Sequence, residues 1–478
     1  MTISLNRILS LCINILFIIL FIFIYSLNIL PSKYLIIILV ILSVIGLSQT
    51  LINFKIKSTT GRLIFIVLDI LIIIGSIIGI RYVKTTNNFF NSLSDVSETS
   101  YYYVLVNKSS KYNTISDLKS KTIGSLNIDS ESYENSKALL KKKIDINIKE
   151  FFNVDDLIKD IIDLKIDSIF INSNIYDIIC ENSDIFKDNT KIIETIEVEI
   201  KKEEVKEDDK KVTHNSFSIL ISGIDTNGPI KKVSRSDVNI VLTVNVDNHE
   251  VLLTSIPRDY YVQLHGTKGN KDKLTHAGIY GINMSMKTIE DLLNTDIKYY
   301  VRVNFDTVIK LVDEIDGIEV YSDKAFTAYN GKKFKKGMNH LDGESALAFA
   351  RERKKFKGGD RARGEHQMDI IEAIIDKVSS TPIFLTNYNK IMKKLSNSFQ
   401  TSIPDTKIKE IIKDQLDFMY DWRVKSFSLN GSDSSNYTYS MPGRKLYVMV
   451  PNKETVNKAS KYINEMISGK TIKEIGIK

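Results

Sequence analysis

The chain has 478 residues, enough for about three domains of ordinary size. Its 65 Lys and Arg residues against 58 Asp and Glu give a net charge of +7, too mild an excess to indicate nucleic-acid binding by itself. The two cysteines, Cys12 and Cys180, lie far apart, one in an apolar run and one in a polar region. Neither a disulfide framework nor a cysteine metal site is therefore expected.

Three apolar stretches open the chain, at residues 8–30, 34–54 and 63–80. The first two are long enough to cross a bilayer as helices, and the third is near the lower limit of about 17 residues. A cleavable signal peptide would not be followed by two further spans. We therefore predict three transmembrane helices within residues 1–84 and a multi-pass protein of the cell membrane.

Basic residues in the loops set the predicted orientation. The short second loop carries Lys55, Lys57 and Arg62, and Arg7 precedes the first span. The positive-inside rule then places the N-terminus and the second loop in the cytoplasm. An odd number of spans leaves everything after about Arg81 extracellular, in an envelope of the Gram-positive type. Because the basic residues of the later domains then lie outside the membrane, we expect no nucleic-acid partner.

Asp69 lies inside the third apolar stretch. A carboxyl group in lipid is costly and usually faces a protein partner. The favoured interpretation is a packing residue between the spans, protonated and hydrogen-bonded. A role in handling lipid is the alternative.

Residues 85–198 are predicted to form a small α/β accessory domain, because short apolar runs alternate with helical patterns. The segments ISDLKSKTIG and IDSIFINS resemble parts of one lobe of a periplasmic solute-binding domain. No clustered ligand set is visible there, so a structural or partner-docking role is favoured over ligand sensing. The charge run that follows marks a linker over residues 199–213, before a last domain at 214–478.

The last domain is expected to be an α/β domain with a central mixed sheet flanked by helices. Charged residues follow or precede three of its predicted strands. Asp225 comes just after the strand at 217–223, and Asp237 directly precedes the next one. Arg258 and Asp259 end the strand after that. In α/β sheets, ligand chemistry gathers at strand ends, so these groups are expected to lie together.

The stretch 346–367 carries the second group of charged residues. Arg351 and Arg353 stand two apart, a glycine pair follows, and Asp360 occupies a predicted helix N-cap. On the helix, Arg363 and Gln367 fall on the inward stripe near the N-terminus. Convergent arginines at a helix N-terminus are typical of a phosphate or pyrophosphate site. The alternative is a basic solvated loop, in which the arginines form internal ion pairs with Glu352, Asp360 and Glu365.

The same helix continues as an apolar stripe beside the predicted phosphate site. Its residues are Ile370, Ile371, Ile374, Ile375 and Val378. We predict that the four isoleucines form an apolar wall for a lipid tail. An ordinary core against the sheet is the commoner use of such a stripe and stays the alternative.

Seven motifs in register, from ISGID through SRSDVNIVLTVN, SIPRDYYV, KLTHA, YYVRVNF and HLDGESALAFARER to GDRARGEHQ, resemble the LytR-CpsA-Psr family. The order and the intervals agree over residues 217–378, and the C-terminal part is also similar. Three N-terminal spans with an extra extracellular domain resemble the capsule-linked branch of that family. One departure is His366, which stands where many members have an arginine.

The resemblance implies an extracellular phosphotransferase. Such enzymes move a glycopolymer from undecaprenyl pyrophosphate onto peptidoglycan at the cytoplasmic membrane. By motif, Asp225 and Asp237 match the carboxylates that hold Mg²⁺ (or Mn²⁺), and Asp259 matches the carboxylate beside the arginine of the IPR motif. The pyrophosphate-binding set is matched by Arg235, Arg258, Arg351, Arg353, Arg363 and Gln367.

Elementary chemistry agrees with this assignment. Several arginines can neutralise a pyrophosphate through bidentate contacts, and Mg²⁺ prefers one or two carboxylates plus phosphate oxygens. Arg258, Asp259 and Arg235 are the predicted catalytic residues. Asp259 is the predicted base for the attacking sugar hydroxyl, and orienting Arg258 through an ion pair is its alternative role. Two other functions compete with this interpretation. One is a pyrophosphatase that uses the same site, and the other is a non-catalytic membrane-bound regulator.

Overall fold

The computed structural model describes residues 2–93, 97–128, 130–200, 216–224, 230–356, 358–381, 391, 394–395 and 398–477. The chain divides into two compact units. A helical unit comprises residues 1–95, 376–396 and 403–421, and an α/β unit comprises residues 96–375, 397–402 and 422–478.

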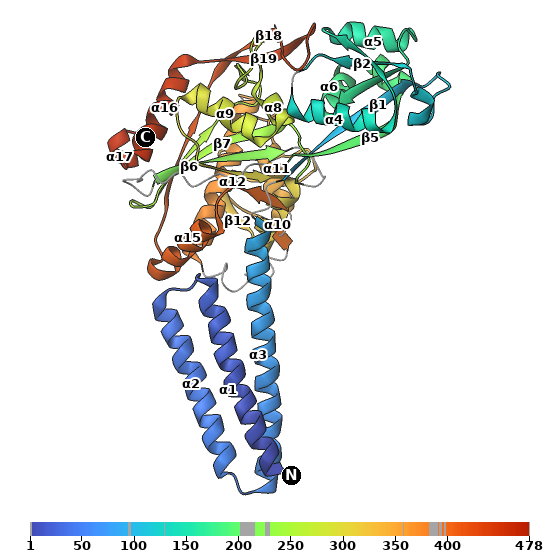
Figure 1. The fold of residues 1–478 in the computed structure, drawn as a ribbon. Coiled ribbons are helices and arrows are strands. Elements are labelled where there is room, and N and C mark those ends of the chain that lie inside the picture. The colour runs from blue at the N-terminus through green and yellow to red at the C-terminus, as the bar shows by residue number, and fades with distance from the viewer. Residues whose placement is uncertain are drawn as a thin grey trace. The chain divides into compact units, whose positions relative to one another are not determined.

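The helical unit contains α1 (Thr2–Leu27), α2 (Ser32–Lys55), α3 (Thr59–Leu93) and α15 (Asp405–Phe418) (Figure 1). The first three are long and apolar enough to cross a membrane, over Leu5–Leu27, Ser32–Lys55 and Thr59–Phe89. α3 runs on to Leu93, past the predicted end of the span at residue 80 and the predicted domain boundary at residue 84. No glycine or proline stands between residues 80 and 93, so nothing in the sequence stops the helix there.

Polar side chains meet inside the three-helix bundle. Asp69 of α3 is fully buried and accepts hydrogen bonds from Asn53 Nδ2 at 2.9 Å and from Gln49, both on α2. Asn6 of α1 donates in turn to Asn53 Oδ1 at 3.3 Å. Hydrogen bonds between helices satisfy polar groups that lipid cannot. Asp69 is therefore hydrogen-bonded between α2 and α3, as the packing interpretation predicts.

The first part of the α/β unit is the accessory domain, a five-stranded sheet of order β3-β2-β4-β1-β5. Its strands are β1 (Glu98–Asn107), β2 (Thr122–Leu126), β3 (Asn147–Phe151), β4 (Ser168–Asn172) and β5 (Thr190–Ile200). Its helices are η1 (Ile115–Leu118), α4 (Glu131–Lys143), α5 (Val154–Ile162), α6 (Ser173–Asn182) and α7 (Asp184–Asn189). α4 packs on one face of the sheet, and α5, α6 and α7 pack on the other.

The short apolar runs of the sequence fall on β1, β2, β4 and β5, and none marks β3. This edge strand is mostly exposed, with only its last residue buried, so it lacks the apolar run that signals a strand. The predicted linker over residues 199–213 lies almost wholly outside the described residues, since β5 extends to Ile200 and the next described residue is Ser216.

The second part of the α/β unit is built on a six-stranded mixed sheet of order β16-β11-β6-β7-β8-β17. Its strands are β6 (Ser216–Ile224), β7 (Ser236–Asn245), β8 (Glu250–Ser255), β11 (Tyr299–Val303), β16 (Phe399–Thr401) and β17 (Arg423–Ser428). The pairs β11/β6 and β8/β17 are parallel, and β6/β7, β7/β8 and β11/β16 are antiparallel. The predicted mixed sheet flanked by helices is confirmed.

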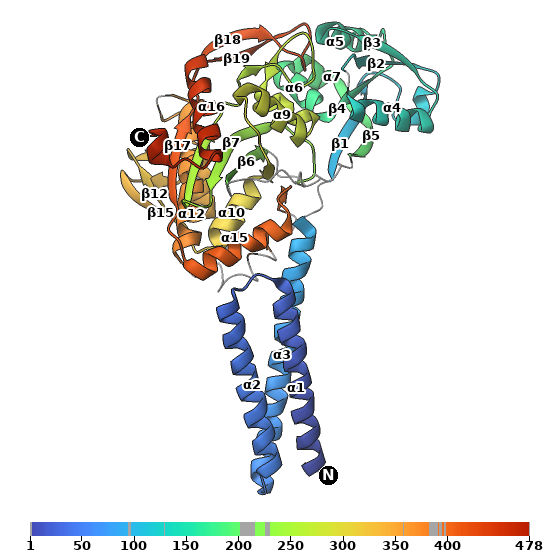
Figure 2. The same ribbon diagram turned by 60° about the vertical axis from the view of Figure 1, so that its left-hand side comes forward.

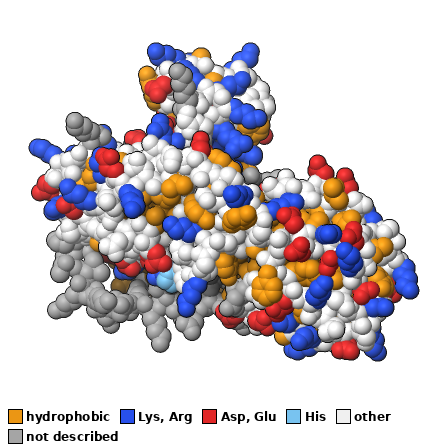
Figure 3. Space-filling model, turned by 90° about the horizontal axis from the view of Figure 1, so that it is seen from above, with side chains coloured by type: hydrophobic (Ala, Val, Ile, Leu, Met, Phe, Trp, Pro, Cys, Tyr) orange, Lys and Arg blue, Asp and Glu red, His pale blue; other side chains and the backbone are white. Residues whose placement is uncertain are grey.

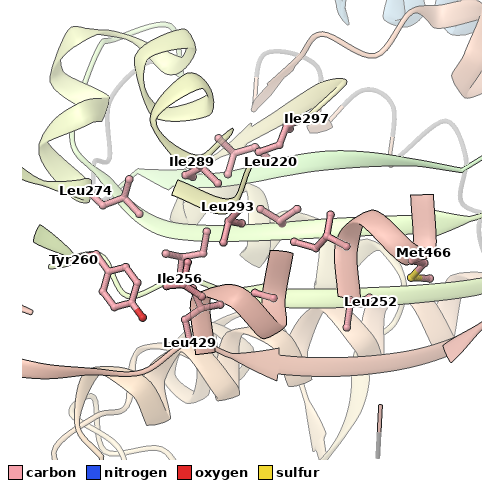
Figure 4. Close-up of a cluster of buried hydrophobic side chains, with 14 of the residues drawn as sticks. Leu220, Leu252, Ile256, Tyr260, Leu274, Ile289, Leu293, Ile297, Leu429 and Met466 are labelled. Carbon is pink, nitrogen blue, oxygen red and sulfur yellow. The ribbon is translucent and has the colours of Figure 1, made fainter. Parts of the chain in front are cut away.

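Helices cover both faces of this sheet (Figure 2). α9 (Ile282–Leu293), α16 (Lys453–Ile467) and α17 (Ile472–Ile475) enclose the main core with Leu220 and Leu252 of the sheet (Figure 4). The other face meets α12 (Asp360–Ser380), with α10 (Phe305–Glu314) and α11 (Gly343–Arg351) beside it. Short hairpins and helices complete the unit: β9 (Tyr261–Val262), β10 (Asp272–Lys273), α8 (Leu274–Ala277), η2 (Gly278–Tyr280), β12 (Ile318–Ser322), β13 (Phe326–Thr327), β14 (Lys333–Phe334), β15 (Gly337–Leu341), β18 (Gly431–Tyr437) and β19 (Lys445–Pro451).

Ion pairs join the accessory domain to the rest of the α/β unit. Glu98 of β1 and Arg302 of β11 lie 2.8 Å apart with side chains only 2% exposed. Glu98 also accepts a hydrogen bond from the backbone of Ile282, the first residue of α9. Removing either partner of a buried pair of this kind would leave an uncompensated charge, which is strongly destabilising. On the face shown in Figure 3, acidic and basic side chains are interspersed, in keeping with the mild net charge.

Candidate active site

Arg258 is the centre of the charged site. It follows β8, and Asp237 lies at the start of the antiparallel neighbour β7, so the register brings the two together. Arg258 Nη1 is 3.0 Å from Asp237 Oδ1, and Nε is 3.6 Å from Asp259 Oδ2 and 3.8 Å from Asp360 Oδ1. Burial lowers the pKa of Arg258, but these three carboxylates outweigh it and the net shift is upward. The Nε atom is buried and has no hydrogen-bond partner among the described residues.

Asp237 is held ionised by its neighbours. Its Oδ1 also accepts a hydrogen bond from Thr275 Oγ1 at 2.9 Å. Burial raises the pKa of this carboxyl, yet the charges of Arg258 and Arg235 outweigh burial and leave the pKa below its ordinary value. Asp237 therefore offers a negative charge to the site at any pH near neutrality.

Asp259 is engaged in ion pairs. Lys273 Nζ lies 2.9 Å from its Oδ1, while its Oδ2 faces Arg258. The β9/β10 pairing sets Lys273 opposite Tyr261, two residues after Asp259. This geometry fits the predicted alternative role of Asp259, which is to orient Arg258.

The N-terminus of α12 completes the site. The helix begins at Asp360, which is thus the first helical residue and not the predicted N-cap. Its carboxylate instead lies 2.5 Å from Arg363 Nη2 and near Arg258. Burial raises the pKa of Asp360 even though both arginines lower it, and burial lowers the pKa of Arg363. Gly364 permits this close approach, because a Cβ there would lie 2.5 Å from Ser255 Oγ of β8.

A small polar cavity of about 10 Å³ lies at these groups, and Gln367 is on its wall. Gln367 also lines a second, larger cavity of about 260 Å³. The larger cavity is apolar and lies between β6, β7 and β11 and the helices α10, α11 and α12. All four predicted lipid-pocket residues line it: Ile370, Ile371, Ile374 and Ile375.

The two arginines of the ALAFARER motif have different surroundings. Arg351, at the end of α11, lines the apolar cavity, and its guanidinium stacks 4.3 Å from the ring centroid of Phe305 and 5.2 Å from that of Tyr329. Arg353 is exposed, and its charge lowers the pKa of both Asp360 and Arg363. Arg235 is paired with Glu181 of the accessory domain.

His366 is turned away from the charged site. It is 6% exposed and packs against the rings of Phe326, Phe349 and Phe356, with Nδ1 3.2 Å from the carbonyl oxygen of Glu352. Burial lowers its pKa, so it is a neutral member of an aromatic cluster. His366 stands where many members of the resembled family have an arginine, and in this chain that position contributes no charge to the site.

Asp225, the second predicted metal ligand, lies outside the described residues. Among the residues that are described, no three His, Cys, Asp or Glu side chains are grouped to hold a metal ion. The chemistry of Asp237 still fits Mg²⁺, because its carboxylate is ionised and this ion takes carboxylate oxygens as ligands.

Sequence reasoning passed over Glu181, Thr275 and Lys273 as partners of site residues. The first lies 54 residues from Arg235 in another domain, and nothing in either motif signals the pairing. By contrast, the ion pair between Asp360 and Arg363 follows from their i, i+3 spacing on the helix. It agrees with the alternative interpretation of the sequence, in which the arginines of this stretch form internal ion pairs.

Fold and site together define a membrane-anchored α/β protein with an arginine-rich charged site beside an apolar cavity. The sequence profile of the LytR_cpsA_psr family matches residues 179–457, and the chain belongs to this family.

Several relatives share part of the chain. It is 36% identical over 201 residues to the polyisoprenyl-teichoic acid–peptidoglycan teichoic acid transferase TagU of Bacillus anthracis, covering 42% of this chain and 65% of that protein. It is 37% identical over 234 residues to TagU of Enterococcus faecalis, covering 48% and 74%. The crystal structure of TagV from B. subtilis is 32% identical with a TM-score of 0.45, covering 54% of this chain and 98% of that one. The chain thus spans less than two thirds of the B. anthracis relative.

Proposed function

We propose that the protein transfers a glycopolymer from undecaprenyl pyrophosphate to peptidoglycan outside the membrane. The observation that carries the proposal is that Gln367 lines both the polar cavity at the arginines and the apolar cavity. A lipid pyrophosphate has these two parts joined, a highly charged head and a long apolar tail. The names of the TagU relatives, which are teichoic acid transferases that use a polyisoprenyl carrier, support the same substrate class.

The arginines bind the pyrophosphate in this mechanism. Arg258 is held by three carboxylates, yet its buried Nε has no hydrogen-bond partner among the described residues and can donate to a phosphate oxygen. Arg363 and the helix N-terminus beside it add positive charge. The negative charge of the substrate phosphate would compensate the guanidinium groups of Arg258 and Arg363, which are now paired with carboxylates of the chain.

The reaction is a phosphoryl transfer. A hydroxyl oxygen of peptidoglycan attacks the phosphorus that carries the glycopolymer, and a new P–O bond forms. The bridging P–O bond of the pyrophosphate breaks, and undecaprenyl phosphate leaves with the electron pair. The hydroxyl proton passes to a carboxylate of the site. Asp259 stays our predicted base, and its ion pairs with Lys273 and Arg258 favour its alternative role in orienting Arg258.

We extend the proposal to Mg²⁺ (or Mn²⁺) as the cofactor. Asp237 would hold it, with Asp225 as the second carboxylate. A bound divalent cation supplies charge neutralisation at the phosphate oxygens. The residues around the polar cavity would orient the phosphate for attack.

The lipid tail is proposed to enter the apolar cavity along α12. The four isoleucines of this helix and Val238 and Leu242 of β7 offer only hydrocarbon to an occupant. Capsule polysaccharide is the polymer class suggested by the three spans and the accessory domain of the family's capsule-linked branch.

The extracellular placement of the α/β unit is also a proposal. It is supported by a contact within the helical unit, where Lys33 Nζ at the start of α2 lies 3.0 Å from Asp417 Oδ1 of α15. α15 belongs to the C-terminal part of the chain, so this part and the α1–α2 loop would share one side of the membrane. The basic loop between α2 and α3 makes the opposite side the cytoplasmic one. Protease added to intact protoplasts should remove the C-terminal domain. Full protection, with control proteins digested, would reverse the topology.

Purified full-length protein with lipid-linked glycopolymer and peptidoglycan tests the function. We expect metal-dependent release of undecaprenyl phosphate together with polymer bound to peptidoglycan. Arg258→Ala should lower the rate by about a hundredfold or more, the usual cost of losing a charged donor at a transition state. Lys458→Ala, an exposed basic residue paired with Glu454, is the matched control. Release of undecaprenyl phosphate without attachment of the polymer to peptidoglycan would indicate a pyrophosphatase. No turnover under any condition would favour a non-catalytic membrane-bound regulator.

A further inference from the structure

Arg235 is bound by a residue of the accessory domain. Its Nη1 donates to Glu181 Oε2 at 2.8 Å, and its Nη2 donates to Glu181 Oε1 at 2.7 Å. This bidentate arrangement is the one that a guanidinium uses for carboxylates and for phosphates alike. Asp177, one turn earlier on α6, adds a second acidic group near Arg235 and Lys232.

The segment that carries Arg235 is also held by backbone contacts to the accessory domain. Thr99 of β1 donates to the carbonyl of Lys231 at 2.8 Å and accepts from the amide of Val233 at 2.9 Å. Asn174 of α6 donates to the carbonyl of Val233 at 3.1 Å. The segment is thus positioned by the same domain that supplies Glu181.

The opposite side of this segment is packed just as closely. A Cβ at Gly278 would lie 2.5 Å from the carbonyl oxygen of Ser234. With its backbone fixed on both sides, Arg235 can change partner only by moving its side chain. Arg235 stands two residues before Asp237 of the site, and its positive charge lowers the pKa of that carboxyl.

We propose that Glu181 competes with substrate phosphate for Arg235, so that the accessory domain sets how tightly the site binds pyrophosphate. The inference rests on the proposed function, because it takes Arg235 to be a phosphate ligand. Glu181 acts through Arg235 and is therefore a positioning residue. When pyrophosphate arrives, the two Nη donors exchange one anionic partner for another.

A matched pair of variants tests the proposal in the full-length protein in detergent. Glu181→Gln removes the competing charge, while Asp155→Asn breaks a second ion pair between the accessory domain and the rest of the unit, to Arg444 at 2.7 Å. The pairs are exposed to nearly the same extent, at 28% and 52% for Arg235 and Glu181 and at 26% and 50% for Arg444 and Asp155. Glu181→Gln should tighten binding of inorganic pyrophosphate about threefold to fivefold, the size of a partly exposed ion pair. Asp155→Asn should leave it unchanged.

Kinetics separate competition from a structural effect. Glu181→Gln should lower KM for the lipid pyrophosphate with little change in kcat, and Glu181→Asp should restore values close to wild type. Calorimetric titration gives the dissociation constants, and thermal unfolding confirms that each variant is folded. Unchanged or weaker pyrophosphate binding in Glu181→Gln, or an equal gain in Asp155→Asn, would overturn the proposal.

One further variant separates this proposal from the proposed function. Arg258→Ala should abolish pyrophosphate binding. If wild type and Arg258→Ala bind pyrophosphate equally, the proposed function itself fails. If Arg258→Ala loses binding while Glu181→Gln behaves as wild type, only the competition by Glu181 is refuted.

Discussion

The apolar cavity makes a quantitative prediction about the lipid tail. Filling a cavity of about 260 Å³ with hydrocarbon at ~24 cal/mol per Å³ would contribute about 6 kcal/mol. That figure is an upper estimate and corresponds to roughly a 10⁴-fold gain in affinity. Affinity should therefore rise with prenyl chain length until the cavity is full, while the head group stays constant.

The perturbation is a charge in the cavity wall. Ile374→Asp places a carboxyl group against the tail, whereas Ile374→Leu conserves volume and polarity at the same position and should change little. The assay compares dissociation constants for geranyl and geranylgeranyl pyrophosphate, which differ only in tail length. Ile374→Asp should weaken the longer ligand much more than the shorter one, with thermal unfolding as the check on folding. Equal affinity of the wild-type protein for both ligands would refute a tail in this cavity.

Three further predictions concern charge. Asp237→Asn should abolish metal-dependent cleavage in a protein that still folds, and full activity in this variant would exclude Asp237 as the metal ligand. Arg302→Met should destabilise the α/β unit by about 3–5 kcal/mol, because it leaves Glu98 buried without its cation, and a thermal shift too small for that loss would contradict this. Burial and nearby carboxylates raise the pKa of Asp369 from 3.8 to about 7. The folded state therefore holds this proton more tightly than the unfolded chain does, and the free energy of unfolding falls as pH rises from about 4 towards 7. Asp369→Asn should accordingly stabilise the protein above pH 7 and have no such effect near pH 4, measured as unfolding temperature against pH.

The sequence predicts those parts of the site that lie on one element or at neighbouring strand ends. Arg363, Gln367 and the isoleucines of α12 follow a helical period, so their common face could be read from spacing. Asp237 and Arg258 flank strands that pair in sequence order.

What the sequence does not predict depends on contacts between distant elements. Glu181 meets Arg235 only because α6 lies against the segment before β7, and neither residue's local pattern encodes that packing. The cavity beside Gln367 is also a tertiary feature. An isoleucine stripe is the same in sequence whether it fills a core or lines a void, and only the positions of α10 and α11 decide between them.

The buried Asp69 has a consequence for how the membrane helices enter the bilayer. An aspartate at the centre of a lone helix costs ~2.5–3.5 kcal/mol on insertion, and its hydrogen-bond partners Gln49 and Asn53 belong to α2. Only residues 56–58 separate the two helices, so α2 and α3 can leave the translocation machinery as one hairpin with the carboxyl group already satisfied. Biogenesis would then depend on α2 arriving first, and a chain that begins at α3 would insert poorly even though α3 is the longest of the three spans.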